Sequence, residues 1–322
     1  MLFRSWMPDV FERFFNDFNR SLSSYYELIR LDPGYRVFFE NDHLDVAADL
    51  KLLYERFDAI EPGSSTRLKA FLKEAQYKYE VGVGNLVYKP GLRLSELIDG
   101  ALFKGLFKLD VFKSLSAHVR KLFKDPRLIQ LLEFPVLFLG AKPQKTPALY
   151  SLMNYADLVL GTWYPNGGML KIGTSMTALA QELGVQVHTQ SAVKRIRIQN
   201  NRVTGIELEK GPLDFDAVVS SADYEYTDRV LLGPEHRQYS QSYWSSRKMA
   251  PSSIIFYLGL NAPLPGVLHH NLFFDAPFDE HAHSIYDAPS WPKSPLFYLS
   301  CTSKTDPTTA PKEHENCFVL IP

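Results

Sequence analysis

Apolar residues in the first half of the chain recur at the spacing of amphipathic helices. The segment 8–30 is the first example: Pro8 suits a first helical turn, and the apolar residues that follow share one face. They are Val10, Phe11, Phe14, Phe15 and Phe18. The same spacing predicts helices over 47–58, 64–80, 94–108, 110–124, 126–139 and 147–160. A turn at 32–34 and a short strand at 35–40 interrupt a region that is otherwise mostly helical.

The pattern changes after Gly161, where short alternating runs replace the long helical ones. A helix over 172–183 is expected to end at Gly184, since glycine favours helix C-caps. The runs that follow alternate like strands and predict a β-meander over 185–189, 193–199, 203–209 and 213–219. Further strands are expected over 253–260 and 297–300. The chain is therefore expected to combine a helical region with α/β and β material, an α+β or α/β fold.

Composition and charge narrow the classes of partner. The chain has 322 residues, enough for two domains and a substantial core. Its 35 Lys and Arg are balanced by 36 Asp and Glu, which gives a formal net charge of −1. Nucleic acid is excluded as a partner because phosphate binding needs clustered, uncompensated cationic side chains. Aromatic residues make up 13% of the chain, which indicates apolar surfaces beyond an ordinary core.

Further features concern the cellular compartment. The two cysteines, Cys301 and Cys317, match no metal or redox spacing, as expected in a reducing cytosol. The start of the chain carries Asp9 and Glu12 and lacks the apolar run of a signal peptide. The longest uncharged stretch, 250–274, is interrupted by prolines and histidines, so we expect no membrane-spanning helix there. These features predict a cytoplasmic protein.

Two glycine-containing segments could approach a flat or phosphorylated ligand. Gly82-Val83-Gly84 has the first half of a dinucleotide-binding loop, but a helical segment precedes it where that loop needs a strand. We interpret it as an ordinary loop. Gly167 and Gly168 are more informative, since adjacent glycines allow close backbone approach and precede a helix with unpaired first N–H groups. A tight turn without a ligand is the alternative for this pair.

Histidines are grouped in the last quarter of the chain. His269 and His270 are adjacent, and His281 and His283 follow shortly after. Neither pair has the helical or carboxylate spacing that is typical of metal sites. We therefore predict polar loop histidines and no metal site.

The motifs from Tyr164 onward, taken in order, resemble those of the FAD-dependent carotenoid desaturases, a branch of the amine-oxidase-like flavoproteins. The matching segments are Tyr164-Pro165-Asn166-Gly167-Gly168-Met169, Ala178-Leu179-Ala180 with Gly184, Val193-Lys194-Arg195-Ile196, and Val218-Val219-Ser220-Ser221-Ala222-Asp223. The earlier segments 7–15 and 31–37 are similar to bacterial-type phytoene desaturases in particular. The resemblance implies a partial, Rossmann-like FAD-binding fold with a β-meander, joined to a largely helical substrate- and membrane-binding domain.

The resemblance also implies roles for particular residues. Val193 would touch the adenine or ribose end of FAD, largely through its backbone. The turn of Ser220, Ser221 and Ala222 would lie near the cofactor phosphates, and Gly167–Gly168 beside the isoalloxazine ring. Ordinary strand and turn roles are the alternative for all three segments.

A linear C40 carotenoid such as phytoene lives in the bilayer, so the resemblance implies an apolar tunnel and peripheral contact with the cytoplasmic membrane. Two segments have apolar and basic faces typical of helices at a membrane interface. Their apolar residues are Leu102, Phe103, Leu106 and Phe107 in one, and Phe112, Leu115, Val119, Leu122 and Phe123 in the other, which Asp110 is expected to cap. Packing inside a helical domain is the equal alternative.

Glu96, within Leu94-Ser95-Glu96-Leu97, is the candidate catalytic residue. A carboxylate in an apolar tunnel could take a proton while hydride passes to the flavin. A solvated carboxylate on a helix is the alternative, because charged side chains are seldom buried.

The order of the motifs divides the chain into three parts. Residues 1–160 are assigned to the substrate- and membrane-binding region, 161–225 to part of the FAD-binding domain, and 226–322 to a β-rich portion of the substrate domain. The Gly-rich pyrophosphate loop and the C-terminal Gly-rich segment of the family are not found, so we expect a partial chain. Three functions remain open. They are desaturation of phytoene towards lycopene, the activity of another carotenoid oxidoreductase (hydroxycarotenoid desaturase, isomerase or ketolase), or binding of polyene or membrane without redox chemistry.

Overall fold

The computed structural model describes residues 6–88, 110–247 and 249–322. The chain forms two compact units, the first built from Met1–Ser175 with Pro251–Pro322 and the second from Met176–Ala250. Helix α8 (Leu170–Glu182) begins in the first unit and continues in the second. These units follow packing and not function, so the three-part division by role stays a prediction.

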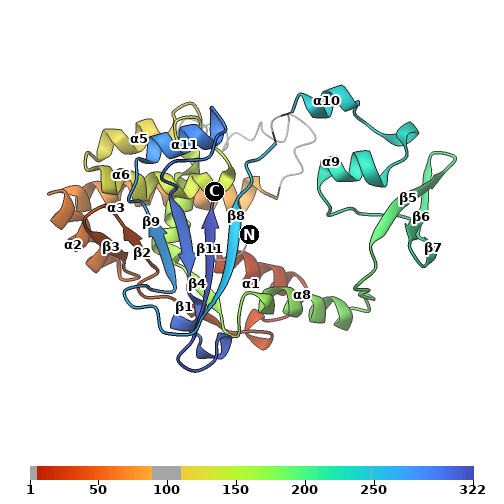
Figure 1. Cartoon of the computed structure of the whole chain (residues 1–322), viewed down its shortest axis with the longest axis horizontal. Helices are drawn as coiled ribbons and strands as arrows, with labels where there is room; N and C mark the ends of the chain where they lie inside the picture. The colour runs from red at the N-terminus through yellow and green to blue at the C-terminus, as the bar shows by residue number, and fades with distance from the viewer. Residues whose placement is uncertain (1–5, 89–109, 248) are drawn as a thin grey trace. The chain divides into compact units, whose positions relative to one another are not determined.

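A six-stranded sheet forms the centre of the first unit, with the strand order β3-β2-β9-β10-β11-β8 (Figure 1). The strands are β3 (His43–Val46), β2 (Tyr35–Phe38), β9 (His270–Phe273), β10 (Phe297–Ser300), β11 (Glu315–Ile321) and β8 (Ile254–Leu260). Neighbouring strands are antiparallel except β2 and β9, which run parallel with Val37 opposite Leu272. This parallel pair joins the beginning of the chain to its last quarter.

Helices pack against one face of this sheet. They include α2 (Leu50–Ile60), α3 (Ser64–Val81), α5 (Leu115–Leu122), α6 (Pro126–Glu133), the 3₁₀ helix η4 (Phe134–Leu139) and α11 (Phe278–Tyr286). Val37, Leu272 and Tyr298 lie in register on this face and share one core cluster with helical residues such as Phe57 and Phe123. Burying large apolar side chains between the two layers is the main stabilising term of the unit.

The opposite face of the sheet, here called the open face, is partly exposed and carries a row of aromatic side chains. Beside that row Arg36 pairs with Asp45 and lies over the Phe38 ring, 5.9 Å from its centroid. Phe38, Phe273 and Phe297 stand opposite one another on β2, β9 and β10. Their rings stack with centroids 4.7 and 4.2 Å apart and interplanar angles of 11°. On β11 and β8 this row continues with the paired Ile321 and Ile254, while the next row on the same face holds Val319 and the 47% exposed Phe256 in register with Leu299 and Asn271. Cross-strand aromatic pairs stabilise a sheet, and their outer edges here form a hydrocarbon surface.

Shorter elements complete the first unit. They are α1 (Pro8–Asp17), η1 (Leu22–Ser24), the antiparallel pair β1 (Leu28–Arg30) and β4 (Trp163–Pro165), the π-helix η2 (Gly82–Leu86), η5 (Ala148–Ser151), α7 (Leu152–Tyr155), the π-helix η6 (Ala156–Leu160), η9 (Thr302–Lys304) and η10 (Pro307–Thr309). The β1–β4 pair places residues 28–30 beside the strand that leads into the turn before α8.

The second unit contains a three-stranded antiparallel meander, β5-β6-β7. Its elements are β5 (Val193–Gln199), β6 (Arg202–Leu208), β7 (Gly211–Asp214), α9 (Tyr224–Tyr226), the π-helix η7 (Thr227–Leu231), η8 (Pro234–His236) and α10 (Gln241–Ser245). The helices α2, α3 and α8 and the strands β2, β5, β6, β8 and β10 confirm the sequence predictions within a few residues.

Several predicted elements are wrong in extent. The helix expected over 8–30 ends at Asp17, because Asn19 adopts a φ of 56° and the chain then turns towards β1. The helix expected over 147–160 is broken into 3₁₀, α and π turns, and the Gly82 segment is a π-helix and not a loop. Residues 185–189 form no strand, and the strand expected over 213–219 ends at Asp214. The spacing of apolar residues does not reveal where a helix or strand breaks, since that spacing reflects which side chains are buried and not the local backbone geometry.

The structure also decides between the alternatives for the segment 110–124. Its helix, α5, is capped by Ser114 and not by Asp110, and Leu115, Val119 and Phe123 are fully buried. These residues therefore pack in the core of the first unit, which leaves Phe112, 90% exposed, outside it. The helix expected over 94–108, with its apolar face at 102–107, lies outside the described residues.

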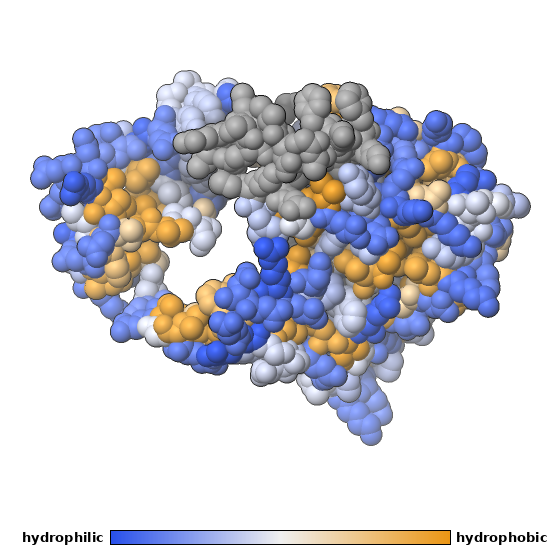
Figure 2. All heavy atoms as spheres, turned by 180° about the vertical axis from the view of Figure 1, so that it is seen from behind, coloured by the Kyte–Doolittle hydropathy of each residue, from blue (hydrophilic) through white to orange (hydrophobic). Residues whose placement is uncertain are grey.

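Hydrophobic side chains reach the surface in several places among hydrophilic ones, as Figure 2 shows for the side opposite to that of Figure 1. Within the described parts of the chain, no helix combines the length and the apolar character needed to cross a bilayer.

Phe123→Ala tests the packing between helices and sheet. The ring is fully buried and lies edge-on to Phe57 and Phe71, with centroids 6.2 and 6.4 Å away. Removing it leaves a cavity, so we expect the free energy of unfolding to fall by about 3–5 kcal/mol in urea titrations. Phe112→Ala, the same change at an exposed position, is the control and should stay within about 0.5 kcal/mol. Equal effects of the two substitutions would contradict the assigned core.

Glu315→Gln tests a buried ion pair on β11. Burial raises the pKa of Glu315, but hydrogen bonds from Lys304, Ser303 and Cys301 outweigh it and lower the pKa to about 2. The pair therefore stabilises the fold above the unfolded pKa of 4.5, and this contribution is lost as the pH falls towards 2. We expect Glu315→Gln to lower stability at pH 7 by on the order of 3 kcal/mol and to converge with the parent protein near pH 2. A difference that does not change with pH would refute the ion pair; exposed Glu313→Gln serves as the control.

Candidate functional site

The turn between β4 and α8 carries the two glycines that the sequence singles out. Gly167 and Gly168 have φ values of 87° and 101°, in the left-handed region that favours glycine. A Cβ at Gly167 would lie 2.9 Å from Cε of Lys171. At Gly168 a Cβ would meet nothing closer than the Tyr164 hydroxyl, 3.9 Å away. The turn therefore presents bare main chain at the start of α8, which suits close contact with a flat ligand.

A buried carboxylate from a distant segment holds this turn. Asp306 accepts a hydrogen bond from the backbone N–H of Gly167 (2.9 Å) and one from the Tyr164 hydroxyl (3.1 Å), both on Oδ2. Its Oδ1 accepts from the N–H and the hydroxyl of Thr308, at 3.0 and 2.5 Å. Burial opposes ionisation, but these bonds outweigh it and hold the pKa of Asp306 below its usual value. The charged carboxylate thus ties the β4–α8 turn to η10.

The sequence alone does not point to Asp306 as a residue of this site. The segment Asp306-Pro307-Thr308 has the form of a helix cap followed by proline, which could have marked the residue as structural. Nothing local marks its link to Gly167, because the two residues are 139 positions apart.

Buried histidines continue from the turn towards the sheet. The Tyr164 ring meets His269 edge-on, with centroids 4.7 Å apart, and His269 Nδ1 bonds the Thr305 hydroxyl at 2.9 Å. His270 Nδ1 bonds the Tyr298 hydroxyl at 2.6 Å. His269 lies in the bend before β9, as predicted for a loop, although it is buried. The loop prediction is wrong for His270, which lies on β9, and for His281 and His283, which lie on α11 with His281 buried. Pairing of β9 with β10 buries His270, which a loop would have left exposed.

The other predicted cofactor residues lie in the second unit. Val193 is half-buried at the start of β5, opposite Leu208 and beside a register irregularity that ends at Arg195. The Ser220 hydroxyl lies 2.8 Å from that of Thr227, on η7. Since η7 packs against β5, Val193 and the Ser220 segment belong to one packed group.

The Ser220–Ala222 turn leaves its main chain accessible. Ser220, Ser221 and Ala222 are all exposed, and Asp223 follows as the cap of α9, with Oδ1 accepting from the Tyr226 N–H at 3.1 Å. The exposed turn at Ser221 and Ala222, in the second unit, and the Gly168 turn, in the first, each offer accessible main chain. This is the kind of contact that the sequence resemblance implies for FAD, so each turn by itself fits the cofactor. Their roles stay predictions. Glu96 lies outside the described residues.

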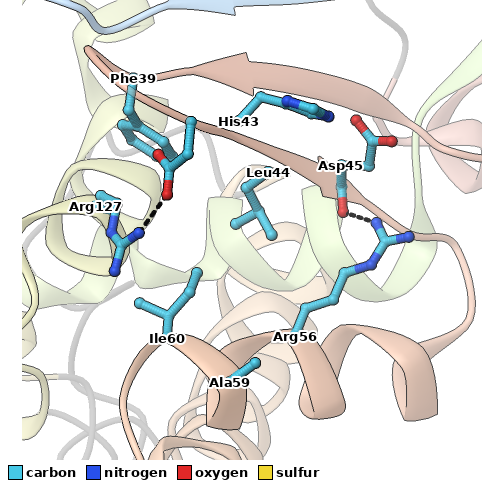
Figure 3. Close-up of a pocket in the computed structure, with 9 residues that line it drawn as sticks. Phe39, His43, Leu44, Asp45, Arg56, Ala59, Ile60 and Arg127 are labelled. Carbon is cyan, nitrogen blue, oxygen red and sulfur yellow. Dashed lines mark hydrogen bonds and ion pairs between the residues drawn. The ribbon is translucent and has the colours of Figure 1, made fainter.

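A separate cleft of about 330 Å³ lies between β3 and α2 (Figure 3). Leu44 and Ile60 give it apolar walls, while Arg56 and Arg127 reach into it. Both arginines have partners: Arg56 donates to the main-chain carbonyl of Asp45, and Arg127 pairs with Asp42 and Asp125. Because charged side chains reach into the cleft itself, it suits a long neutral hydrocarbon poorly.

Glu74, Asp110 and His118 bring three potential ligand atoms within 4.8 Å of one another. Two ammonium groups share this cluster: Lys78 Nζ lies 2.9 Å from the Asp110 carboxylate and Lys113 Nζ lies 3.0 Å from His118 Nδ1. Burial and these lysines lower the pKa of His118 to about 4. The arrangement stabilises the junction of α3 and α5 and opposes a bound cation.

Comparison with known proteins agrees with the resemblance seen in the sequence. The family described as flavin containing amine oxidoreductase matches residues 31–317. A carotenoid 3,4-desaturase of Haloarcula japonica is 36% identical over 325 residues, which cover 99% of this chain and 65% of that protein. A zeta-carotene-forming phytoene desaturase of Myxococcus xanthus is 31% identical over 319 residues, covering 98% and 61%. The chain thus spans less than two thirds of the length of these relatives.

Among solved structures, the PF1083 protein of Pyrococcus furiosus aligns with a TM-score of 0.54 and 12% identity, over 92% of this chain and 60% of that one. This likeness concerns the fold alone. The expected mixed α and β flavoprotein fold and the flavin cofactor are confirmed by the family match and the architecture together. The chain belongs to the flavin-containing amine oxidoreductase family.

Proposed function

We propose that the protein desaturates a linear carotenoid in carotenoid biosynthesis, with FAD as the hydride acceptor. The identities of 36% and 31% to a carotenoid 3,4-desaturase and a phytoene desaturase, each over nearly the whole chain, support this class. Phytoene, converted towards lycopene, is the substrate proposed first. The higher identity to the 3,4-desaturase favours a second candidate, a linear carotenoid that is already conjugated.

The open face is the observation that carries this proposal. A substrate made of carbon and hydrogen offers no hydrogen bonds, so its site must be apolar and free of unpaired charge. The stacked rings of Phe38, Phe273 and Phe297 provide such a surface, and β8 extends it with alternate exposed side chains, Ile254, Phe256 and Leu258. Ring edges carry partial positive charge, which favours contact with the π-electrons of a polyene.

The proposed roles of the chain's residues are binding, orientation and exclusion of water. Main chain at Gly167–Gly168, beside Val193 and at Ser220–Ala222 would hold FAD, which supplies the redox chemistry when bound. The open face would hold the polyene and keep water from it. Glu96 remains the candidate for taking up a proton, as a proposal from the sequence.

Peripheral binding to the cytoplasmic membrane is also proposed, because such a substrate must be drawn from a bilayer. Phe112 supports it: the ring is 90% exposed, Lys113 follows it in the sequence, and α5 carries the exposed Lys121. One aromatic ring beside basic side chains gives weak, reversible attachment.

Expression in a host that accumulates phytoene tests the function, with pigments separated by HPLC. We expect phytoene to be consumed, and a host that supplies lycopene distinguishes the second candidate. If the purified chain carries FAD but converts neither pigment, the proposed function is wrong.

The same assay tests the open face with Phe273→Leu and Phe297→Leu. Each change removes a ring edge but keeps an apolar side chain, so we expect turnover to fall roughly 3- to 10-fold with unchanged FAD content. Phe18→Leu, at the 40% exposed C-cap of α1, is the matched control and should retain full turnover. Unchanged turnover in both β9 and β10 variants would exclude the open face as the polyene surface.

Phe112→Ser tests attachment to membranes by co-sedimentation with anionic vesicles. Because one exposed ring contributes roughly 1.5–3 kcal/mol when buried, we expect the bound fraction of the parent chain to fall severalfold in the variant. Trp291→Ser, at a 78% exposed position after α11, is the control. A parent chain that does not pellet with vesicles would disprove the attachment.

A further inference from the structure

The carboxylate of Asp306 accepts more hydrogen bonds than the cap of η10 needs. The cap of η10 uses only Oδ1, which accepts both hydrogen bonds from Thr308. Oδ2 is directed instead to Gly167 and Tyr164, which belong to the β4–α8 turn. With 2% of its surface exposed, the carboxylate is shielded from water, where hydrogen bonds to a charged group are strong.

The bond to Gly167 acts on the least stable part of the turn. Two consecutive glycines in left-handed conformation have many alternatives when unbound, and ordering each one costs more than ordering any other residue. A charged acceptor that fixes the first N–H selects one conformation of the pair. The Tyr164 hydroxyl, shared on the same oxygen, fixes the strand from which the turn departs.

We propose that Asp306 is a positioning residue for the flavin, acting through the Gly167–Gly168 turn. This inference rests on the part of the proposed function that places FAD at this turn. Asp306 itself does not touch the reacting atoms. It holds the Gly167–Gly168 main chain in one conformation before FAD binds, so that the free energy of binding is not reduced by the cost of ordering the turn.

Three substitutions test separately the acceptor oxygen of Asp306, the charge of Asp306 and the hydroxyl donor of Tyr164. Asp306→Ala removes every bond to the turn. Asp306→Asn keeps a carbonyl oxygen that can accept from the Gly167 N–H but removes the charge, so it is the conservative variant. Tyr164→Phe deletes one hydroxyl from a buried ring and leaves the Gly167 bond in place. Asp275→Ala, at an exposed acidic residue of the same unit, is the control.

Two properties of each purified variant are measured. They are the affinity for FAD, by fluorescence titration, and the rate of amide hydrogen exchange over residues 164–170 in the absence of FAD. For Asp306→Ala we expect affinity to fall at least about tenfold, the cost of losing a charge-assisted bond, and exchange at Gly167 to accelerate. Asp306→Asn should recover part of both, and Tyr164→Phe should lose less than Asp306→Ala. Asp275→Ala should match the parent.

The outcomes are decisive for this inference. FAD affinity and amide exchange unchanged in Asp306→Ala would overturn it, as would a parent chain that takes up no FAD. If Asp306→Ala does not fold, the graded losses in Asp306→Asn and Tyr164→Phe decide in its place, and parent-like behaviour of both overturns it. A chain that binds FAD in this Asp306-dependent way and yet converts no carotenoid would reject the proposed substrate while retaining the role of Asp306.

Discussion

The parallel pairing of β2 with β9 is the constraint on which the rest of the structure depends. It places Val37 beside Leu272 on the helix-covered face and Phe38 beside Phe273 on the open face. One register therefore sets both the core and the apolar surface, because successive side chains on a strand point to opposite sides. A shift by one residue would exchange the two and expose the core residues to water.

The two faces perform different physical tasks. One face packs against helices and stabilises the fold by burying apolar side chains, as Phe57 and Phe123 illustrate. The other remains partly exposed and carries stacked rings, a state that has a cost in water unless a ligand or another surface covers it. Close to the sheet, the polar group around Asp306 and Tyr164 holds the glycine turn. An apolar surface and a preorganised backbone are the two requirements for oxidising a hydrocarbon with a bound flavin.

Long regular elements could be predicted from the sequence, and contacts between distant segments could not. The helices around 50–60, 64–81 and 170–182 and the meander from Val193 follow local periodicity. The short strands β1, β3, β4 and β9 form because of their partners, and three or four residues carry too little pattern to show this. For the same reason the glycine turn was identified while Asp306, which holds it, was not. Glu96 and the segment around it stay predictions.

Reduction of bound flavin by substrate tests the central claim most directly. The purified chain, loaded with FAD and kept without oxygen, is mixed with vesicles that contain phytoene or, in a second sample, lycopene, and its visible absorption is followed. Our account predicts bleaching of the oxidised flavin, in proportion to the desaturated product formed, with one of the two carotenoids and no bleaching with empty vesicles. A flavin that stays oxidised with both carotenoids would contradict it.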